Sequence, residues 1–81
     1  MILPTKNLDQ SRAIIIVGGE ILALLQSPKT NSKLWDDYKE FRLKQEYSSV
    51  SYDWFVLALD FLFLIGTILY DDGKIIRVKK R

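Results

Sequence analysis

Few residues in this sequence are of the types that carry out chemistry. Histidine and cysteine are both absent, so the sequence lacks the most common general base, the thiol nucleophile and the most common metal ligand. Two pairs of neighbouring carboxylates remain, Asp36-Asp37 and Asp71-Asp72. The first pair falls on the solvent side of a predicted helix and the second in a predicted turn, and neither has a base, a nucleophile or a phosphate-binding glycine loop nearby. We therefore expect no enzymatic activity, no metal site and no cofactor.

A pair of glycines, Gly18-Gly19, interrupts the first apolar run of the chain. Its spacing matches neither the G-x-G-x-x-G fingerprint nor the Walker motif, so it does not indicate a nucleotide site. Each glycine in a helix interior costs about 1 kcal/mol relative to alanine. Such a cost is tolerated where another backbone approaches closely or where the helix kinks, and the sequence leaves both alternatives open.

Length and composition point to contacts outside the chain. The 81 residues are expected to form one domain, 1–81, and a domain of this size buries only a modest fraction of its surface. Hydrophobic residues make up 48% of the sequence, which is rich for a domain with so much surface. We infer that part of the apolar surface is shared with a partner.

Nothing in the sequence indicates export or membrane insertion. The absence of cysteine makes an intracellular protein the default, and the first ten residues lack the basic-then-apolar order of a secretion signal. The apolar runs 13–25 and 54–70 are interrupted by Glu20 and Asp60, and a membrane span needs about 20 apolar residues. We expect a cytoplasmic protein without a membrane segment.

The positive charge is confined to the end of the chain. The net charge is +2, yet the first 73 residues hold seven basic and ten acidic side chains. The remaining eight residues, KIIRVKKR, carry five basic groups and no acid: Lys74, Arg77, Lys79, Lys80 and Arg81. These groups are available to contact DNA phosphates without reading sequence, to dock on an acidic partner or to remain solvated.

Apolar periodicity predicts two amphipathic helices after an extended arm at 1–8. The first helix is expected at 10–26 with Asp9 as its N-cap, and the second from Thr30 to about Gln45. Their expected core residues are Ile14, Val17, Ile21, Leu24, Leu25, Leu34, Tyr38 and Phe41. Their expected outer residues are Arg12, Ile16, Gly19, Glu20 and Ala23 on the first helix, and Asp36, Lys39, Glu40 and Lys44, spaced for ion pairs, on the second.

A third helix at 51–66 is the element around which the rest is organised. Ser51 is expected as its N-cap, Asp53 favours the first turn, and Gly66 marks its end. At 100° per residue, one side carries the expected core residues Phe55, Ala58, Leu59, Leu62 and Ile65. The opposite side carries Asp53, Leu57, Asp60 and Leu64, with Val56 beside them. A mixed apolar and acidic face favours a protein–protein interface over the alternative of a core helix with scattered exposed leucines.

Two short β-branched runs, 67–70 and 74–78, follow the third helix. The Asp-Gly pair between them, Asp72-Gly73, predicts a hairpin. Three helices followed by a hairpin give the expected fold class, a mainly helical α+β winged helix-turn-helix domain, with 79–81 as a basic tail. In such a domain the third helix would enter the DNA major groove. Here it would present carboxylates, which DNA phosphates repel, and leucines, which offer no hydrogen-bond donors, so the sequence argues against this mode of DNA reading.

Several pieces of the sequence resemble the small middle components of bacterial ABC-three-component systems. The most specific piece is Tyr52–Asp60, YDWFVLALD. The weaker pieces are Leu3-Pro4-Thr5-Lys6, Glu20-Ile21-Leu22 with Leu24-Leu25, and Pro28-Lys29-Thr30 with Leu34-Trp35. The resemblance covers nearly the whole chain.

The resemblance implies a prokaryotic defence module in which a middle component bridges an SMC- or Rad50-like ABC ATPase and an effector, often a nuclease. We therefore expect a non-catalytic adaptor subunit that binds its partner through the third helix. The alternatives are a small winged-helix DNA-binding regulator that uses its wing and basic tail, and a homodimer that buries the third helix against its own copy. The resemblance implies no catalytic residues.

Overall fold

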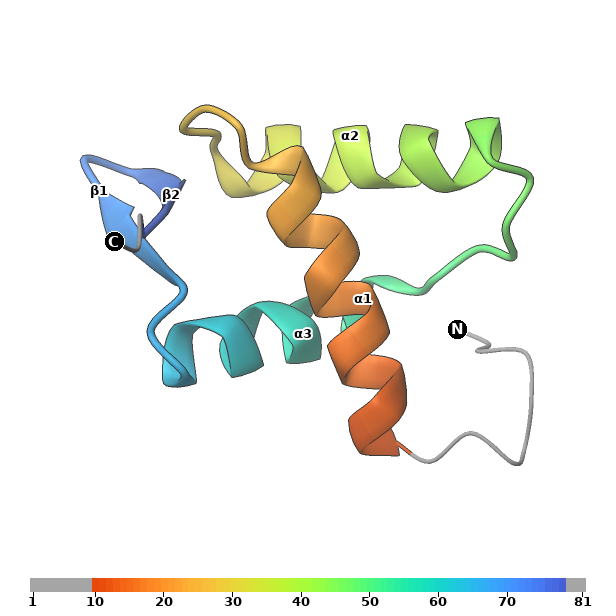
Figure 1. Ribbon diagram of the computed structural model, residues 1–81. Coiled ribbons are helices and arrows are strands. Elements are labelled where there is room, and N and C mark those ends of the chain that lie inside the picture. The colour runs from red at the N-terminus through yellow and green to blue at the C-terminus, as the bar shows by residue number, and fades with distance from the viewer. Residues whose placement is uncertain (1–9, 79–81) are drawn as a thin grey trace.

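The computed structural model describes residues 10–78, so the expected arm at 1–8, Asp9 and the tail residues Lys79, Lys80 and Arg81 lie outside the described residues. Three helices precede a two-stranded antiparallel hairpin in a mainly helical, winged-helix-like α+β fold, as the sequence predicts. The elements are α1 (Gln10–Leu24), α2 (Asn31–Lys44), α3 (Tyr52–Leu64), β1 (Ile68–Asp71) and β2 (Lys74–Arg77). In Figure 1, α1 crosses the view between α2 and α3, and the hairpin stands at one end of the molecule.

The contact between α1 and α3 explains one of the two helical glycines. A Cβ atom at Gly18 would lie 3.2 Å from Cδ2 of Leu62, so the absence of a side chain makes room for that leucine. A Cβ atom at Gly19 would meet no atom within 4 Å. Of the two alternatives that the sequence leaves open, close approach is therefore the role of Gly18, although the approaching group is a side chain and not a backbone. The packing of the described residues gives Gly19 no such role.

The second helix begins and carries its charges as the sequence predicts. The Thr30 hydroxyl accepts a hydrogen bond of 3.2 Å from a backbone N–H in the first turn, which makes it the N-cap. Lys39 pairs with Asp36 and Lys44 pairs with Glu40, each with an N–O distance of 3.7 Å. These are solvent-exposed pairs, each worth a few tenths of a kcal/mol.

The predicted hairpin turn is confirmed in detail. Asp72 and Gly73 both have positive φ, 55° and 78°, as the two central residues of a type I′ turn require. The pairing of β1 with β2 continues past the strand ends, where the N–H of Val78 donates to the carbonyl of Thr67 at 2.8 Å. The two predicted strand-like runs, one beginning at Thr67 and the other ending at Val78, therefore both take part in the hairpin.

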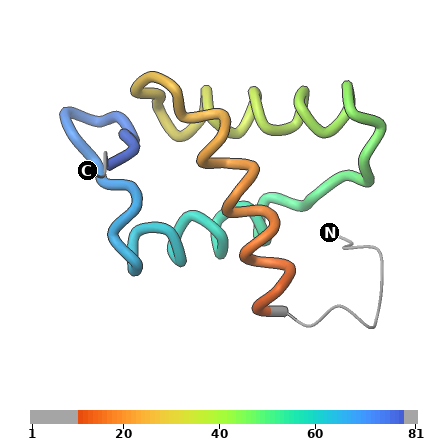
Figure 2. Tube along the Cα trace, in the orientation of Figure 1, coloured from red at the N-terminus to blue at the C-terminus, as the bar shows by residue number. Residues whose placement is uncertain are grey.

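A segment predicted only as a helix breaker also joins the hairpin. The backbone N–H of Lys29 donates to the carbonyl of Ile75 at 3.1 Å, and the N–H of Ile75 donates back at 2.7 Å. This isolated bridge lies between α1 and α2 in the chain, and it fixes the wing to the start of α2. Figure 2 follows the chain from this connection into α2 and later into the hairpin beside it.

The third helix ends one residue earlier than its apolar pattern suggests. The N–H of Gly66 donates to Phe63 at 3.1 Å and that of Thr67 donates to Leu62 at 3.0 Å, the hydrogen bonds of a Schellman motif with Gly66 at φ 79°. Ile65, which the sequence predicts in the core, is the C-cap residue and is 53% exposed. That prediction was wrong because the backbone leaves the helical path at this point.

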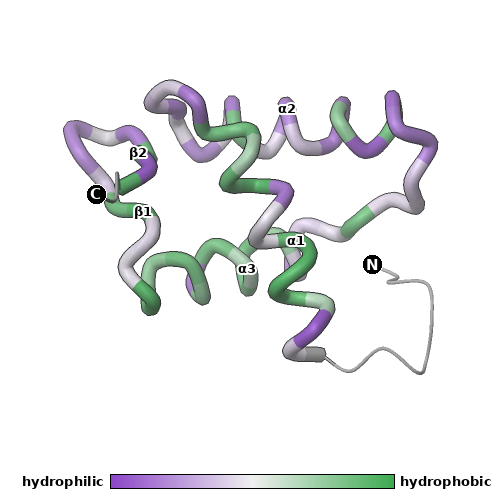
Figure 3. The backbone as a smooth tube through the Cα atoms, viewed as in Figure 1, coloured by the Kyte–Doolittle hydropathy of each residue, from purple (hydrophilic) through white to green (hydrophobic). Residues whose placement is uncertain are grey.

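The core lies where the three helices and the wing meet. Its buried members come from every element and are Val17, Ile21, Leu25, Leu34, Tyr38, Val50, Phe55, Ala58, Leu59, Leu62, Ile68 and Ile75. Figure 3 shows that α2 is hydrophilic over much of its length, whereas α3 is hydrophobic over most of its length. One side of α3 packs into the core, so the apolar residues on its other side lie outside the core.

The two glycines of α1 should respond to alanine in opposite ways. Gly19→Ala should raise the free energy of unfolding by about 1 kcal/mol, because alanine is the better helix former and meets nothing. Gly18→Ala makes the same gain but crowds Leu62, and overpacking costs about 1–3 kcal/mol. Thermal or urea unfolding should rank Gly19→Ala above wild type and Gly18→Ala at or below it. Equal stabilisation by both substitutions would show that the contact between Gly18 and Leu62 is not tight.

Candidate functional site

The side of α3 that faces away from the core is apolar and acidic. Leu57 is 48% exposed and Leu64 is 86% exposed, and Asp53 and Asp60 are also exposed. Val56 is half-buried at the edge of this surface. We call these five residues the outer face of α3. They are the residues that the sequence predicts as a partner interface, and their role in binding stays a prediction.

A groove beside the outer face extends the surface toward the wing. It has a volume of about 380 Å³, and Val56 and Asp60 line it together with Asn31, Tyr52, Leu59, Phe63 and Tyr70. The ring of Tyr70 from β1 stacks on Phe63 with 5.0 Å between centroids, so the wing forms one wall. At the other end, the amide of Asn31 donates to the hydroxyl of Tyr52 at 2.9 Å.

The sequence patterns do not predict the aromatic wall of this groove. They place Tyr70 only within a strand, and they place Phe63 neither on the core side nor on the interface side of the helix. A usable signal was present, because a hairpin that follows a helix through a short connection folds back beside that helix. Large aromatic side chains at 63 and 70 were therefore candidates for a contact across the connection.

The seven acidic residues of α2, α3 and the wing fall into two groups. On α2, Asp36 and Glu40 are paired as above, and Asp37 binds both Lys29 and Lys33. The hydrogen bond from Lys29 holds the pKa of Asp37 below its usual value, more than burial raises it. On α3 and in the wing turn, Asp53, Asp60, Asp71 and Asp72 have no lysine or arginine partner among residues 10–78.

Behind this surface, a half-buried polar cluster joins α1, α2 and the loop that leads into α3. The Arg42 guanidinium donates from one nitrogen to both oxygens of Glu20, at 2.8 and 3.0 Å, and the Tyr38 hydroxyl donates to Glu20 at 2.7 Å. The Nε of Arg42 donates to the carbonyl of Ser48 at 2.9 Å. The sequence predicts Glu20 on the solvent side of α1, and this was wrong because Arg42 and Tyr38 draw its carboxylate inward.

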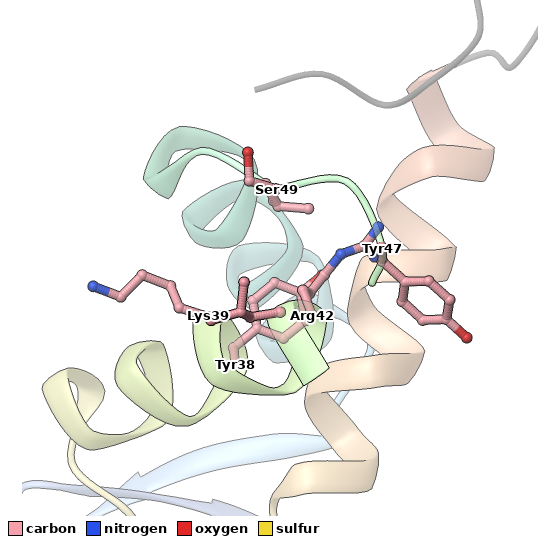
Figure 4. Close-up of a pocket in the computed structure, with 7 residues that line it drawn as sticks. Tyr38, Lys39, Arg42, Tyr47 and Ser49 are labelled. Carbon is pink, nitrogen blue, oxygen red and sulfur yellow. The ribbon is translucent and has the colours of Figure 1, made fainter. Parts of the chain in front are cut away.

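A second hollow, of about 210 Å³, lies beside this cluster. Its lining residues are Tyr38, Lys39, Arg42, Leu43, Tyr47, Ser49 and Val50. Figure 4 shows the Lys39 ammonium and the Tyr47 hydroxyl pointing in opposite directions, away from the labelled residues between them. The guanidinium carbon of Arg42 lies 5.0 Å from the centroid of the Tyr47 ring, so this cation already interacts with a side chain of the protein. The polar groups do not converge on a substrate position.

Two of the five basic residues predicted to contact DNA or a partner can be placed. Lys74 and Arg77 are exposed on β2. Arg77 donates to the carbonyl of Leu22 at 3.2 Å, which joins the wing to the last turn of α1. Lys79, Lys80 and Arg81 lie outside the described residues.

The described part of the chain offers no other chemical centre. Over residues 10–78, no three acidic, histidine or cysteine side chains gather where they could hold a metal ion. Among the helices of that region, none is both long and apolar enough to cross a bilayer.

Over residues 3–79 the sequence matches the family described as ABC-three component (ABC-3C) system Middle Component 6. Comparisons with curated proteins and with solved structures found no match. The matched range includes all five elements of the fold, the outer face of α3 and the wing.

The polar cluster predicts how stability depends on alkaline pH. Burial, followed by the hydrogen bond to Glu20, raises the pKa of Tyr38 above its usual value of about 10. Below pH 10 this tyrosine is protonated in the folded and unfolded states alike. Above it the unfolded state ionises first, so the free energy of unfolding should fall by up to about 1.4 kcal/mol per pH unit.

The measurement is chemical denaturation of wild type and Tyr38→Phe between pH 8 and pH 11. The variant should lose about 1 kcal/mol at pH 8, where the hydrogen bond is missing, and should lose less stability than wild type as the pH rises. Parallel pH curves for the two proteins would mean that Tyr38 is not ionised on unfolding.

Proposed function

This chain belongs to the Middle Component 6 family of ABC-three-component systems, and from that premise we propose that it is a non-catalytic adaptor subunit of a prokaryotic antiviral or anti-plasmid defence complex. A middle component has partners in its own system. In our proposal these partners are an SMC- or Rad50-like ABC ATPase and an effector subunit, often a nuclease. The chain bridges the two in the cytoplasm.

The outer face of α3 is the observation that carries this proposal. Leu57 and Leu64 lie one above the other on the helix, because seven residues make almost two turns. Burying each leucine is worth about 1.5–3 kcal/mol before the costs of association are subtracted. Exposed leucines of this kind add little to the stability of the isolated domain and stabilise a complex when a partner covers them, which is the property expected of an adaptor.

The surface of the wing supports a second contact. Lys74 is exposed on β2, and the basic tail follows it in the sequence. We propose that the wing and tail reach either the second subunit or the DNA backbone. A DNA-binding regulator that uses only these groups is the competing proposal, and the tail experiment below separates it from the adaptor.

Charged substitutions on the outer face should release the partner and leave the domain folded. Leu57→Asp or Leu64→Asp places a carboxylate where we expect an apolar contact, so the loss of co-purification with the neighbouring gene products should be nearly complete. The matched control is Leu43→Asp, because Leu43 is 77% exposed on a different helix, α2. Circular dichroism and thermal unfolding should show all three variants folded.

The placement is wrong if both outer-face variants still co-purify with the partner. It is also wrong if Leu43→Asp causes the same loss, because the effect would then follow from any added surface carboxylate. Loss with the outer-face variants alone supports the proposal.

Truncation after Val78 tests the basic tail. It removes Lys79, Lys80 and Arg81, so subunit assembly should persist, while retention of the complex on DNA at low salt should fall. Unchanged retention on DNA would show that the tail does not contact DNA phosphates. If the isolated chain shifts DNA in a salt-dependent way and ignores its neighbours, the regulator proposal replaces the adaptor.

A further inference from the structure

We propose that the outer face of α3 and the groove beside it bind a basic amphipathic helix of the partner subunit. The binding side of that helix carries lysine or arginine together with apolar residues. This inference rests on the proposed function, because it names the chemistry of the partner for the same surface. It follows from how the exposed and half-buried residues of α3 are arranged and from which of its charges lack a counter-ion within residues 10–78.

Three rows run along α3, each made of two residues seven positions apart. Leu57 and Leu64 form one apolar row, and Val56 and Phe63 form another, which lines the groove. Asp53 and Asp60 form an acidic row between them at 100° per residue. Each row spans about 10 Å along the helix axis, so the surface is long and narrow. A second helix is the shape that follows such rows, with its side chains set between them.

The acidic row indicates the charge of that helix. Asp53 and Asp60 lie among apolar neighbours and have no cationic partner within residues 10–78, whereas the acids of α2 all have one. Asp71 and Asp72 are likewise unpaired at the tip of the wing, next in sequence to the Tyr70 wall of the groove. Covering this surface with an apolar partner would bury two carboxylates without compensation, which is strongly unfavourable. A partner that supplies lysine or arginine removes that penalty.

The same charges disfavour the other occupants. If a second copy of the chain packed α3 against α3, four carboxylates would be brought together with no cation from either face. Nucleic acid would place phosphates against the acidic row, and the row offers them no donor. A basic helix is the occupant that both the apolar rows and the acidic row accept.

The test uses the complex purified after co-expression with the neighbouring genes. Asp53→Asn/Asp60→Asn removes two charges and keeps the shape of the surface. The control Asp36→Asn/Glu40→Gln removes two exposed carboxylates from α2 and changes the net charge equally. In about 0.1 M salt the outer-face double variant should bind the partner about tenfold more weakly, and the control should bind as wild type does. Wild-type affinity should fall as salt is raised to about 0.5 M, with a shallower fall for the outer-face variant.

The outcomes separate this inference from the proposed function. If Leu57→Asp releases the partner but Asp53→Asn/Asp60→Asn binds normally with the salt dependence of wild type, the surface is right and the basic helix is wrong. If neither variant affects binding, the surface itself is wrong. Full binding by the charge-reversed Asp53→Lys/Asp60→Lys protein would also overturn the inference, because lysines cannot be paired by a basic helix.

Discussion

The ion pair between Glu20 and Arg42 is the constraint on which the geometry of this small domain depends. It joins α1 to α2, and the second hydrogen bond of Arg42, to Ser48, fixes the loop that leads into α3. Removing one partner of the pair would leave the other charge buried and unpaired, which is strongly destabilising. Every buried side-chain nitrogen and oxygen among the described residues has a hydrogen-bond partner, so the cluster of Glu20, Tyr38 and Arg42 leaves no buried polar atom unpaired.

With α3 oriented in this way, its apolar residues divide between two environments. Phe55, Ala58, Leu59 and Leu62 enter the core, where Leu62 occupies the space left by Gly18. Leu57 and Leu64 point the other way, and no helix or strand within residues 10–78 covers them. A chain of 81 residues cannot surround a helix that is apolar on nearly all sides. The outer face of α3 is therefore where we propose the subunit contact, and the family to which the chain belongs is one of middle components.

Local signals were enough to predict the elements, because caps and turns depend on neighbours in the sequence. Thr30 at the start of α2, Gly66 at the end of α3 and the turn at Asp72-Gly73 all act within a few residues. The outer face of α3 was also predictable, since it follows from helical periodicity alone. One error is local, because Ile65 becomes exposed where the backbone leaves the helix. The other contacts that the sequence did not reveal join distant segments: Glu20 turns inward to Arg42, 22 residues away, and Lys29 pairs with the wing. The groove depends on the wing folding back on α3, which periodicity within one helix does not describe.

The most direct test of the adaptor account is the native mass of the chain, measured once when it is expressed alone and once when it is expressed with the genes beside it. The account predicts stable co-elution with a large ATPase subunit in the second case. A monomer or dimer that does not bind the products of the neighbouring genes and binds DNA would contradict the account. The outer face of α3 would then not be a subunit interface.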